Sequence, residues 1–369
     1  TDGGGVGDGE EVNAGTDPRD PTDDSGPGLS QSQAVLAYAP FVSLHPRERW
    51  YPMGATSFVN LSKLKFAHDN CKDTTVEQIV SPLALGNGGY TAQQTNNFCI
   101  KTGPNIPSDQ LTRPDDTDSR KVTDLHEGFF LDLLQSCRSG VTPIGACVGE
   151  DGYSGQFSGS YNGPRIDYSF VNHRYITYWF MYGMNLPGND PSIGGKTIKG
   201  GKALDRHEGE WERVTVQLDG TNHAVGMWYF AHFCQPVFYT WPGRLTPPGT
   251  TSQGTVPLRE GHPLVYSALG SHASYPVRAS GIDPVNLGAT NCGLIHINPQ
   301  DETGEGAQWR TWTGSLINAA TEPWYGTTGR GYGGAWGEVG SIPNAPTLQG
   351  LPAINTGPLG PPWKFPFPS

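Results

Sequence analysis

Short stretches of alternating apolar and polar residues recur through the second half of the chain. Residues 212–218 alternate most clearly, with Val214, Val216 and Leu218 on one face and polar side chains between them. Further runs rich in β-branched and aromatic residues continue the pattern: residues 168–182, 225–233, 237–241 and 264–269. Because successive side chains of a strand point to opposite faces, these stretches are typical of strands. Gly and Pro turns separate them, which predicts an all-β fold, an antiparallel β-sandwich with long loops.

One helix is predicted among these strands. Asp124 and Glu127 have the spacing of a capping box, which satisfies the first backbone N–H groups of a helix. Apolar residues follow at helical spacing: Leu125, Phe129, Leu133 and Leu134. This helix is expected to end near Gly140. Upstream, residues 34–44 form a compact apolar run, and residues 84–122 are rich in Gly, Asn, Asp and Pro and predict a long loop excursion.

The composition agrees with one large domain that contains few helices. The 369 residues include 51 Gly and 32 Pro, the two residue types least suited to helix interiors, so one or two short helices are expected. The C-terminal part is rich in tryptophan: Trp309, Trp312, Trp324, Trp336 and Trp363. We expect it to wrap the sandwich in loops. The prediction is therefore a single β-sandwich domain over residues 34–369.

The first 33 residues form an acidic, glycine-rich segment with eight Asp or Glu and one Arg. Such a segment cannot bury enough apolar surface to offset its ordering entropy, so residues 1–33 are predicted to be disordered. The whole chain has a formal net charge of -11. Nucleic-acid binding needs a basic surface, so this class of partner is not expected.

The six cysteines predict three disulfides, because their number is even, their spacing is wide and no C-x-x-C pair is present. The expected pairs are Cys137 with Cys147, which closes a short loop, Cys71 with Cys99, and Cys234 with Cys292. Other pairings stay open, as do six buried free thiols. Disulfides indicate a secreted protein. No stretch reaches the roughly 18 apolar residues of a transmembrane helix.

The chemistry is concentrated in residues 207–212, with the sequence His-Glu-Gly-Glu-Trp-Glu. On an extended chain Glu210 and Glu212 point to the same face, and His207 can curl back to join them. One imidazole and two carboxylates suit a divalent cation such as Ca²⁺, Mg²⁺ or Mn²⁺. The carboxylates would equally serve as acid and base in a glycan-cleaving site. The alternative is an exposed charged turn that leads into a strand.

Two more histidines follow apolar runs, His232 after one and His272 after another. We expect both to meet His207 at one end of the sandwich, with His272 as a further catalytic candidate. For either residue the alternative is a hydrogen-bonded core histidine. The chain has no G-x-S-x-G, P-loop, dinucleotide-binding or H-E-x-x-H motif.

A set of short segments, each present once, follows in a characteristic order along the chain. They are Tyr38-Ala39-Pro40, Leu44-His45-Pro46, Glu48, Tyr178-Trp179-Phe180, Tyr182, Asn185, residues 207–212, Trp228-Tyr229, His232, residues 263–267, Gly270-Ser271-His272-Ala273, Trp336-Gly337 and residues 357–361. This order resembles the vacuolar protein sorting-associated protein 62 family over about residues 34–364. Such proteins usually carry Gly-Asp-Trp-Glu where this chain has Gly209-Glu210-Trp211-Glu212. The family name describes a sorting phenotype and implies no chemistry.

The His-x-x-acid-Trp-Glu pattern after an aromatic strand also resembles the necrosis- and ethylene-inducing-like proteins. Those are secreted β-sandwich cytolysins that hold a divalent cation and bind sphingolipid head groups. The resemblance implies His207, Glu210 and Glu212 as metal ligands. The upstream acidic ligand of those toxins has no clear match; Asn185 is neutral, and Asp205 is a possible substitute. We expect the ligand to contact a set of surrounding residues: His232, Trp211, Asn185, Tyr182 and His45.

Three functions are compatible with the sequence. The first is a secreted protein whose divalent-cation site binds a glycan or a lipid head group. The second is a metal-dependent hydrolase or lyase that acts on a polysaccharide, with Glu210, Glu212 and His272 as catalytic residues. The third is a structural cell-envelope protein without an active site. The sequence does not decide whether the protein is an enzyme.

Overall fold

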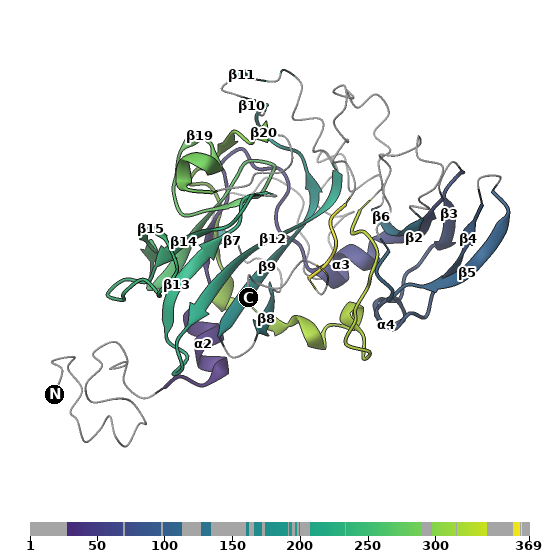
Figure 1. The fold of residues 1–369 in the computed structure, drawn as a ribbon, viewed down its shortest axis with the longest axis horizontal. Helices are drawn as coiled ribbons and strands as arrows, with labels where there is room; N and C mark the ends of the chain where they lie inside the picture. Colours follow the sequence, from purple (N-terminus) through teal and green to yellow (C-terminus); the bar gives the residue numbers. More distant parts are fainter. Residues whose placement is uncertain are drawn as a thin grey trace.

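The computed structural model describes residues 28–68, 71–96, 99–112, 127–133, 160–161, 166–171, 174–190, 192–193, 196–197, 199, 207–232, 234–289, 297–314, 316–337, 357–361 and 363. Strands dominate these residues (Figure 1), which confirms the all-β class. Residues 1–27 of the expected disordered segment lie outside the described residues. So do Asp205, Cys137, Cys147 and Cys292.

A sheet of seven described strands runs through the centre of the molecule (Figure 1). Its strand order is β15 (Ser252–Thr255), β14 (Val237–Thr240), β13 (Ala224–Tyr229), β12 (His207–Leu218), β9 (Tyr175–Asn185), β8 (Ile166–Val171) and β23 (Leu316–Asn318). The long strands β9 and β12 pair in the middle of this sheet. The alternating residues 212–218 belong to β12, as the pattern predicted.

A second sheet packs against one face of the first and completes the sandwich. Its described strands are β16 (Leu258–Arg259), β17 (His262–Ser267), β1 (Phe41–Ser43), β22 (Gln308–Arg310) and β7 (Ser160–Tyr161), with β18 (Ser274–Tyr275) paired to β17. The core between the sheets contains Val42 and Val265 from the second sheet and Phe180, Val214 and Tyr229 from the first. Cross-sheet packing of these apolar faces is what makes the two layers a sandwich.

The strand pairing is mixed, although the sequence pattern predicted an antiparallel sandwich. Neighbours joined by short turns, such as β12–β13 and β13–β14, are antiparallel. Four described pairs are parallel: β1–β17, β14–β15, β22–β7 and β23–β8. In most of these pairs the partners are far apart in the sequence. Parallel pairing needs a crossover connection, which the long insertions of this chain provide.

The other face of β9 and β12 builds a second core. Because side chains alternate along a strand, Phe180 enters the sandwich core while Trp179, Met181 and Trp211 face the opposite way. There they meet a three-stranded sheet of β3 (Thr74–Glu77), β2 (Ser62–Ala67) and β6 (Gly128–Leu133). Three further layers of chain pack on it: α3 (Ala55–Asn60), α4 (Pro82–Gly86) and the 3-10 helices η4 (Ala319–Thr321) and η5 (Pro323–Tyr325).

Residues 128–133 form strand β6, so the predicted helix from Asp124 is wrong over its described part. Every residue of β6 is buried, and the strand pairs with β2 along its whole length. The run Gly-Phe-Phe-Leu-Asp-Leu is apolar on both faces, and such a run suits a strand that is covered on both sides. Glu127 accepts hydrogen bonds from the backbone N–H and hydroxyl of Thr95 and caps no described helix. Residues 113–126 and 134–140 lie outside the described residues.

Three short α-helices are described where one or two were expected, and the sequence pattern had not located them. Helix α2 (Gln31–Ala37) begins with a capping box in which Ser30 and Gln33 satisfy each other's backbone N–H groups. It therefore starts before residue 34, where the folded part was expected to begin. Within the described residues no helix is long and apolar enough to cross a membrane.

The remaining elements are small. They comprise the hairpin β4 (Thr91–Thr95) and β5 (Lys101–Pro107), the sheet β10 (Ser192–Ile193), β11 (Lys196–Thr197) and β20 (Ile297–Asn298), the pair β19 (Ser280–Ile282) and β21 (Asp301–Glu302), and the 3-10 helices η2 (Pro284–Leu287) and η3 (Thr311–Thr313). Cys71 and Cys99 form the predicted disulfide. Cys234 is also disulfide-bonded.

Three of the C-terminal tryptophans lie inside the molecule, whereas Trp312 and Trp363 are only partly buried. Trp309 is in β22 and belongs to the sandwich core, whereas Trp324 and Trp336 are fully buried in the second core beside Trp211. The segment around Trp336 passes so close to β12 that a Cβ atom on Gly209 would overlap the Trp336 carbonyl oxygen. Gly209 also has a φ of 62°, which favours glycine. This close backbone approach fixes the start of β12, where the candidate site lies.

Candidate functional site

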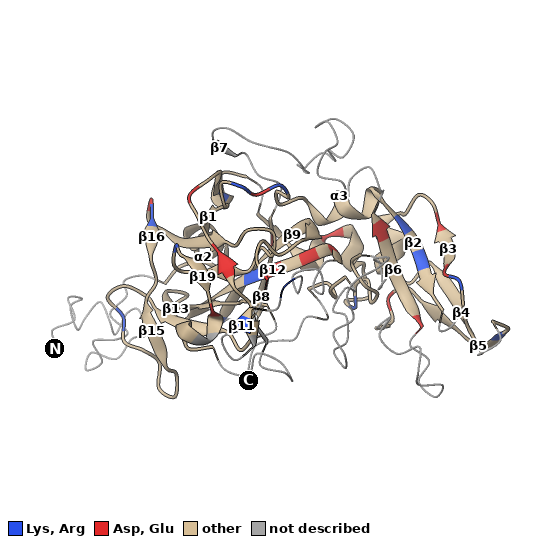
Figure 2. Ribbon diagram, turned by 90° about the horizontal axis from the view of Figure 1, so that it is seen from above, with Lys and Arg blue, Asp and Glu red and all other residues tan. Residues whose placement is uncertain are grey.

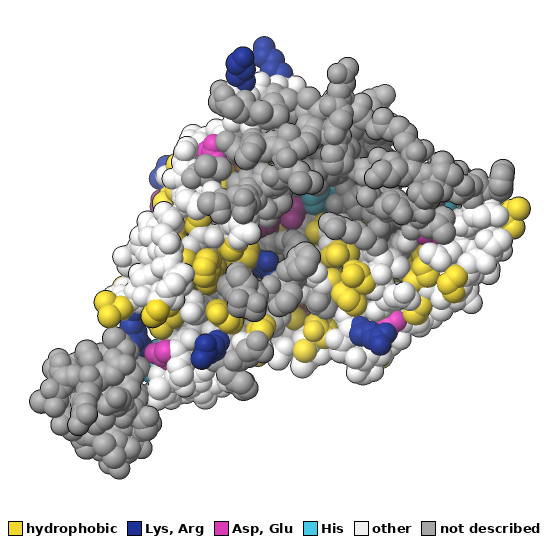
Figure 3. Space-filling view, in the orientation of Figure 1, with side chains coloured by type: hydrophobic (Ala, Val, Ile, Leu, Met, Phe, Trp, Pro, Cys, Tyr) yellow, Lys and Arg dark blue, Asp and Glu magenta, His cyan; other side chains and the backbone are white. Residues whose placement is uncertain are grey.

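Residues 207–212 form the first half of β12 and are buried, so they are not an exposed charged turn. Glu210 and Glu212 are 7% and 6% exposed. They pair in register with Tyr182 and Phe180 of β9, and His207 pairs with Asn185 at the end of the same strand. Figure 2 marks acidic positions along this end of β12. In Figure 3, acidic and histidine side chains gather near the centre of the face shown.

His207 is held in one orientation by the backbone that follows it. Its Nδ1 lies 2.8 Å from the Gly209 carbonyl oxygen and 3.1 Å from that of Glu208. Carbonyl oxygens only accept hydrogen bonds, so Nδ1 carries a proton and donates it. Nε2 lies 3.1 Å from Glu210 Oε2 and 3.0 Å from the Asn185 amide nitrogen. An imidazole whose Nδ1–H is bound by backbone carbonyls has the fixed orientation that metal-binding histidines have, and the same contact distance also suits a histidine–carboxylate ion pair.

Glu208 and Trp211 lie between the candidate ligands His207, Glu210 and Glu212 in the sequence, but their side chains contact the second core. A carboxylate oxygen of Glu208 accepts a hydrogen bond from the backbone N–H of Leu133 at 3.0 Å and so ties β12 to β6. Trp211 is 1% exposed and packs at right angles to Trp179 and Trp336. Its place is in this aromatic cluster, on the face away from Glu210, rather than beside a ligand as expected.

Tyr182 connects the carboxylates to His272. Its hydroxyl lies 3.2 Å from the hydroxyl of Ser267, and its ring stacks on the imidazole of His272 with a centroid distance of 3.8 Å. Burial raises the pKa of Tyr182 well above its usual value, and the carboxylates of Glu48, Glu212 and Glu210 raise it further. Tyr182 therefore keeps its proton over the physiological range.

His272 is fully buried beside Tyr182 and has a φ of 56°, a left-handed conformation that costs energy for a residue with a side chain. Its Nε2 lies 3.5 Å from Glu48 Oε1. Neither ring nitrogen forms a hydrogen bond with a described residue. Buried polar groups almost always have hydrogen-bond partners, so His272 is an exception to the usual pattern of a core histidine.

Glu48 is a buried carboxylate that organises the chain around His272. It accepts hydrogen bonds from the backbone N–H groups of Arg49 at 2.7 Å, Trp50 at 2.8 Å and Gly270 at 2.7 Å. Burial alone would raise the pKa of Glu48, but His272 and these hydrogen bonds outweigh it and hold the pKa below its usual value. Glu48 stays ionised and joins the turn before His272 to the segment that follows β1.

His232 belongs to a second buried dyad next to this site. Its Nε2 donates to Asp301 Oδ2 at 2.7 Å, and the same carboxylate accepts from the hydroxyls of Tyr275 and Ser271. Burial would raise the pKa of Asp301, but His232 and the two hydroxyls lower it overall. His232 also has a positive φ, of 54°. Ser271 directly precedes His272 in the chain, so the pair of His232 and Asp301 is close to the pair of His272 and Glu48.

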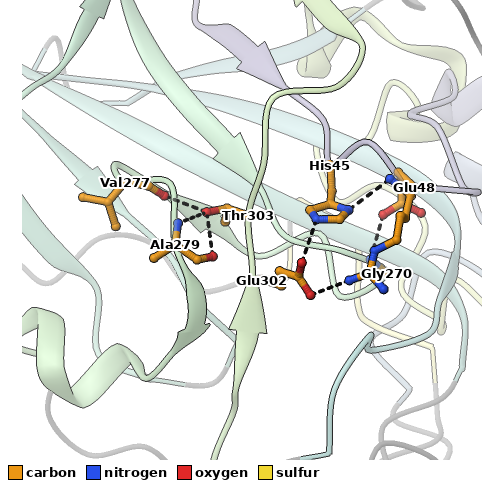
Figure 4. Close-up of polar contacts among 8 residues, drawn as sticks. His45, Glu48, Gly270, Val277, Ala279, Glu302 and Thr303 are labelled. Carbon is orange, nitrogen blue, oxygen red and sulfur yellow. Dashed lines mark hydrogen bonds and ion pairs between the residues drawn. The ribbon is translucent and has the colours of Figure 1, made fainter.

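His45 lies beside Glu48 (Figure 4) and is buried. Its Nδ1 accepts from the backbone N–H of Arg47 at 3.1 Å, so Nε2 carries the proton and donates to Glu302 at 3.3 Å. Arg47 pairs with the same carboxylate. Both nitrogens of His45 are thus engaged in bracing the 45–50 segment, which in turn positions Glu48.

The structure brings most of the expected site residues together. His207, Asn185, Glu210 and Tyr182 lie where the end of β9 pairs with the start of β12, His272 stacks on Tyr182, and Glu212 lies further along β12. His232 and His45 take part in neighbouring contacts with Asp301 and Glu302. Sequence reasoning had assigned no role to Glu48 and had missed Asp301. Glu48 was visible only as part of a family resemblance, and Asp301 lies in β21, a strand of two residues that the sequence pattern did not indicate. Asp205 lies outside the described residues.

The donors around His207 fit a cation only in part. Within the parts of the chain that the structure describes, no group of three or more His, Cys, Asp or Glu side chains is arranged to hold a metal ion. His207 and Glu210 supply two donors. A half turn of the Asn185 carboxamide would present its oxygen where its nitrogen now lies, and this oxygen would be a third donor.

Searches for relatives found no protein-family model, no curated protein and no solved structure that matches this chain.

Proposed function

We propose that the start of β12 is a divalent-cation site through which the protein binds an oxygen-rich ligand, a glycan or a lipid head group. The observation that carries this proposal is the fixed orientation of His207. Its Nδ1 is bonded to two backbone carbonyls, and its Nε2 faces Glu210 Oε2 at 3.1 Å. When Nε2 of His207 carries no proton, its lone pair and the Glu210 carboxylate repel each other. A cation bound between Nε2 and the carboxylate would replace this repulsion by two favourable contacts.

The nature of the donors favours Ca²⁺, Mg²⁺ or Mn²⁺. Glu210 and the Asn185 carboxamide offer oxygen atoms, His207 offers one nitrogen, and Glu212 adds a second carboxylate on the same face of β12. Hard divalent cations accept such sets and complete their shell with water or with ligand oxygens. Asp205 would extend the set from the residues just before β12. A hydroxyl group that replaces a bound water would then tie the ligand to the cation.

The same proposal places the protein outside the cell. The disulfide between Cys71 and Cys99 supports this, because disulfides persist in secreted proteins and are rare in the cytosol.

Cation binding can be measured directly. Protein purified without chelator is analysed for metals, and chelator-treated protein is titrated with Ca²⁺, Mg²⁺ and Mn²⁺ by calorimetry. We expect one cation per chain, a higher melting temperature with the cation, and at least about a tenfold loss of affinity in Glu210→Gln. Glu260→Gln is the matched control, because Glu260 pairs with Arg310 on the surface. Absence of binding, or equal binding by Glu210→Gln, would overturn the proposal.

A second candidate is a hydrolase or lyase that acts on a polysaccharide. The arrangement that favours it is Tyr182, which burial keeps protonated, beside its register partner Glu210 and within electrostatic reach of Glu212. A protonated hydroxyl and an ionised carboxylate are the acid and base that such reactions need. The test is release of reducing or unsaturated ends from polysaccharides, with loss of product in Glu210→Gln. Binding without any product would leave the first proposal alone.

A further inference from the structure

Helix α3 ends at the one asparagine of the chain that lies in an N-glycosylation sequence. Asn60, Leu61 and Ser62 form the pattern Asn-x-Ser, and no other asparagine has Ser or Thr two positions later. This pattern is the acceptor for an N-linked oligosaccharide in secreted chains, provided that x is not proline. A match of three residues is common by chance, so the position of Asn60 in the fold decides whether a glycan can be accommodated.

Helix α3 turns Asn60 away from the second core. Successive residues of a helix are about 100° apart around its axis. Phe58 is fully buried against Trp336 and points inward, so Asn60, two positions later, points to roughly the opposite side. Thr56, one turn before Asn60, shares this outer face and is partly buried, whereas Asn60 is exposed. A substituent on Asn60 therefore extends into solvent and displaces no core side chain.

The carboxamide of Asn60 holds nothing together in the part of the chain that the structure describes. Among these residues it forms no hydrogen bond and no ion pair. The end of α3 is closed by other groups: the backbone N–H of Leu61 donates to the carbonyl oxygens of Ser57 and Phe58 at 3.0 and 3.2 Å. Replacement of a hydrogen on the Asn60 amide nitrogen by a sugar would thus break no described contact.

The hydroxyl of Ser62 indicates when a sugar could be attached. The glycosylation pattern requires a hydroxyl group two residues after the asparagine, so this group must be accessible during the transfer. In the folded protein Ser62 is 2% exposed, and its hydroxyl donates to the Phe58 carbonyl at 2.7 Å. Attachment therefore belongs to the unfolded chain during secretion, before α3 forms. The folded protein has only to accommodate the product on its surface.

We propose that Asn60 is an N-glycosylation site, which carries one oligosaccharide when the chain passes through a secretory pathway that contains an oligosaccharyltransferase. The amide nitrogen of Asn60 forms a bond to the anomeric carbon of a lipid-diphosphate oligosaccharide. The bond from that carbon to a phosphate oxygen breaks, the lipid diphosphate leaves, and the amide nitrogen loses one proton.

This site is separate from the cation site, but it rests on the same extracellular location. The support for that location is the Cys71–Cys99 disulfide. The inner face of α3 lies against the start of β12, where the Phe58 ring approaches Gly209. A glycan on the outer face is consequently directed away from the candidate cation site.

The full chain, preceded by a signal peptide, is secreted from yeast and from mammalian cells and is treated with peptide N-glycosidase. We expect one glycan per chain in electrophoresis, its removal by the enzyme, and conversion of the Asn60 carboxamide to a carboxylate in peptide mass spectra. Asn60→Gln and Ser62→Ala should abolish the glycan. Ser62→Thr keeps the hydroxyl and should retain it.

Asn286→Gln is the matched control. Asn286 is also exposed and also followed by leucine, but Gly288 stands where the glycosylation pattern needs Ser or Thr. The glycan should be unchanged in this variant. The Cys71–Cys99 disulfide is an internal control, because its presence in the secreted protein shows that the chain passed through an oxidising compartment.

The melting temperatures of the glycosylated protein and of Asn60→Gln should agree within about 2 °C, since the change lies on the surface. A markedly lower value for the glycosylated protein would contradict the outward placement of Asn60. Secreted protein that contains the disulfide but has no glycan, or a glycan that persists in Asn60→Gln, would overturn the proposal. A glycan at Asn60 without cation binding would leave this proposal standing and overturn the proposed function, and cation binding by secreted, unglycosylated protein would do the reverse.

Discussion

Two buried carboxylates, Glu48 and Asp301, remain charged because each is surrounded by donors. Three backbone N–H groups meet Glu48, and a histidine with two hydroxyls meets Asp301. Both have a pKa below the usual value in the folded protein. Their contribution to stability is therefore fully present above the usual carboxyl pKa and is lost as pH falls through the lowered folded value.

Glu48→Gln tests this pH dependence. The change removes a charge that three backbone donors and His272 stabilise, so we expect a loss of about 3 kcal/mol in the free energy of unfolding at pH 7. Because the variant no longer has this ionised group, its stability should fall less steeply than the wild type below about pH 4.5. Urea unfolding at pH 7, 5, 4 and 3 measures both effects. Glu260→Gln, at an exposed ion pair, should match the wild type closely.

Gly209→Ala tests the close approach of backbones at the start of β12. Alanine at this position would adopt an unfavourable positive φ, and its Cβ would overlap the Trp336 carbonyl oxygen. We expect a loss of at least about 3 kcal/mol in the free energy of unfolding. Gly220→Ala is the control, since a Cβ there meets nothing within 4 Å. Equal denaturation midpoints for the two variants would contradict the described path of the 336–337 segment.

At the scale of elements, the sequence predicts strands best where apolar and polar residues alternate or β-branched and aromatic residues are dense. Val214, Val216 and Leu218 alternate with polar residues, and β12 is correspondingly easy to locate. β6 was mistaken for a helix because it is buried on both faces, so its apolar residues fit helical spacing as well as a strand. Helix α2 has a sequence signal, the capping box of Ser30 and Gln33. This signal lies at the end of an acidic, glycine-rich segment whose composition is typical of disorder.

The candidate site was predictable only where its residues share one stretch of sequence. Residues 207–212 and His272 were identified from local patterns. His272 pairs with Glu48, and His232 pairs with Asp301. Each pair joins segments that are distant in the sequence, and the pattern of apolar and polar residues does not predict such contacts. The same limit explains Trp211: its neighbours suggested a ligand contact, but the alternation of β12 turns it toward the second core.

The Cys71–Cys99 disulfide joins the turn before β3 to the start of β5. Its loop spans 28 positions in the sequence, and constraint of the unfolded chain by a loop of this size contributes about 3 kcal/mol to stability. The double variant Cys71→Ser, Cys99→Ser should lose about this much in urea unfolding under non-reducing conditions. If its midpoint equals that of the wild type, then the β2–β3–β6 sheet and the β4–β5 hairpin are held by their packing alone.

At the scale of the whole molecule, one pair of strands serves two cores. β9 and β12 present Phe180 and Val214 to the sandwich and Trp179 and Trp211 to the second core. The site lies at the end of this shared pair, where the His45–Trp50 segment and the turn before His272 also meet it. Such an arrangement ties the geometry of the site to both cores, since displacement of either strand would move Glu210 relative to Tyr182.

Adjacent substitutions on β9 can decide whether the two cores unfold together. Phe180→Ala removes a ring from the sandwich core, and Met181→Ala removes a side chain from the second core; each is expected to cost about 2–5 kcal/mol. If the chain is a single cooperative domain, both variants should lower the midpoint of one common transition, seen equally by circular dichroism and tryptophan fluorescence. Two transitions, with each variant shifting only one, would mean that the β2–β3–β6 layer folds as a unit of its own. A single transition would instead mean that a change in either core can reach the cation and ligand site through β9.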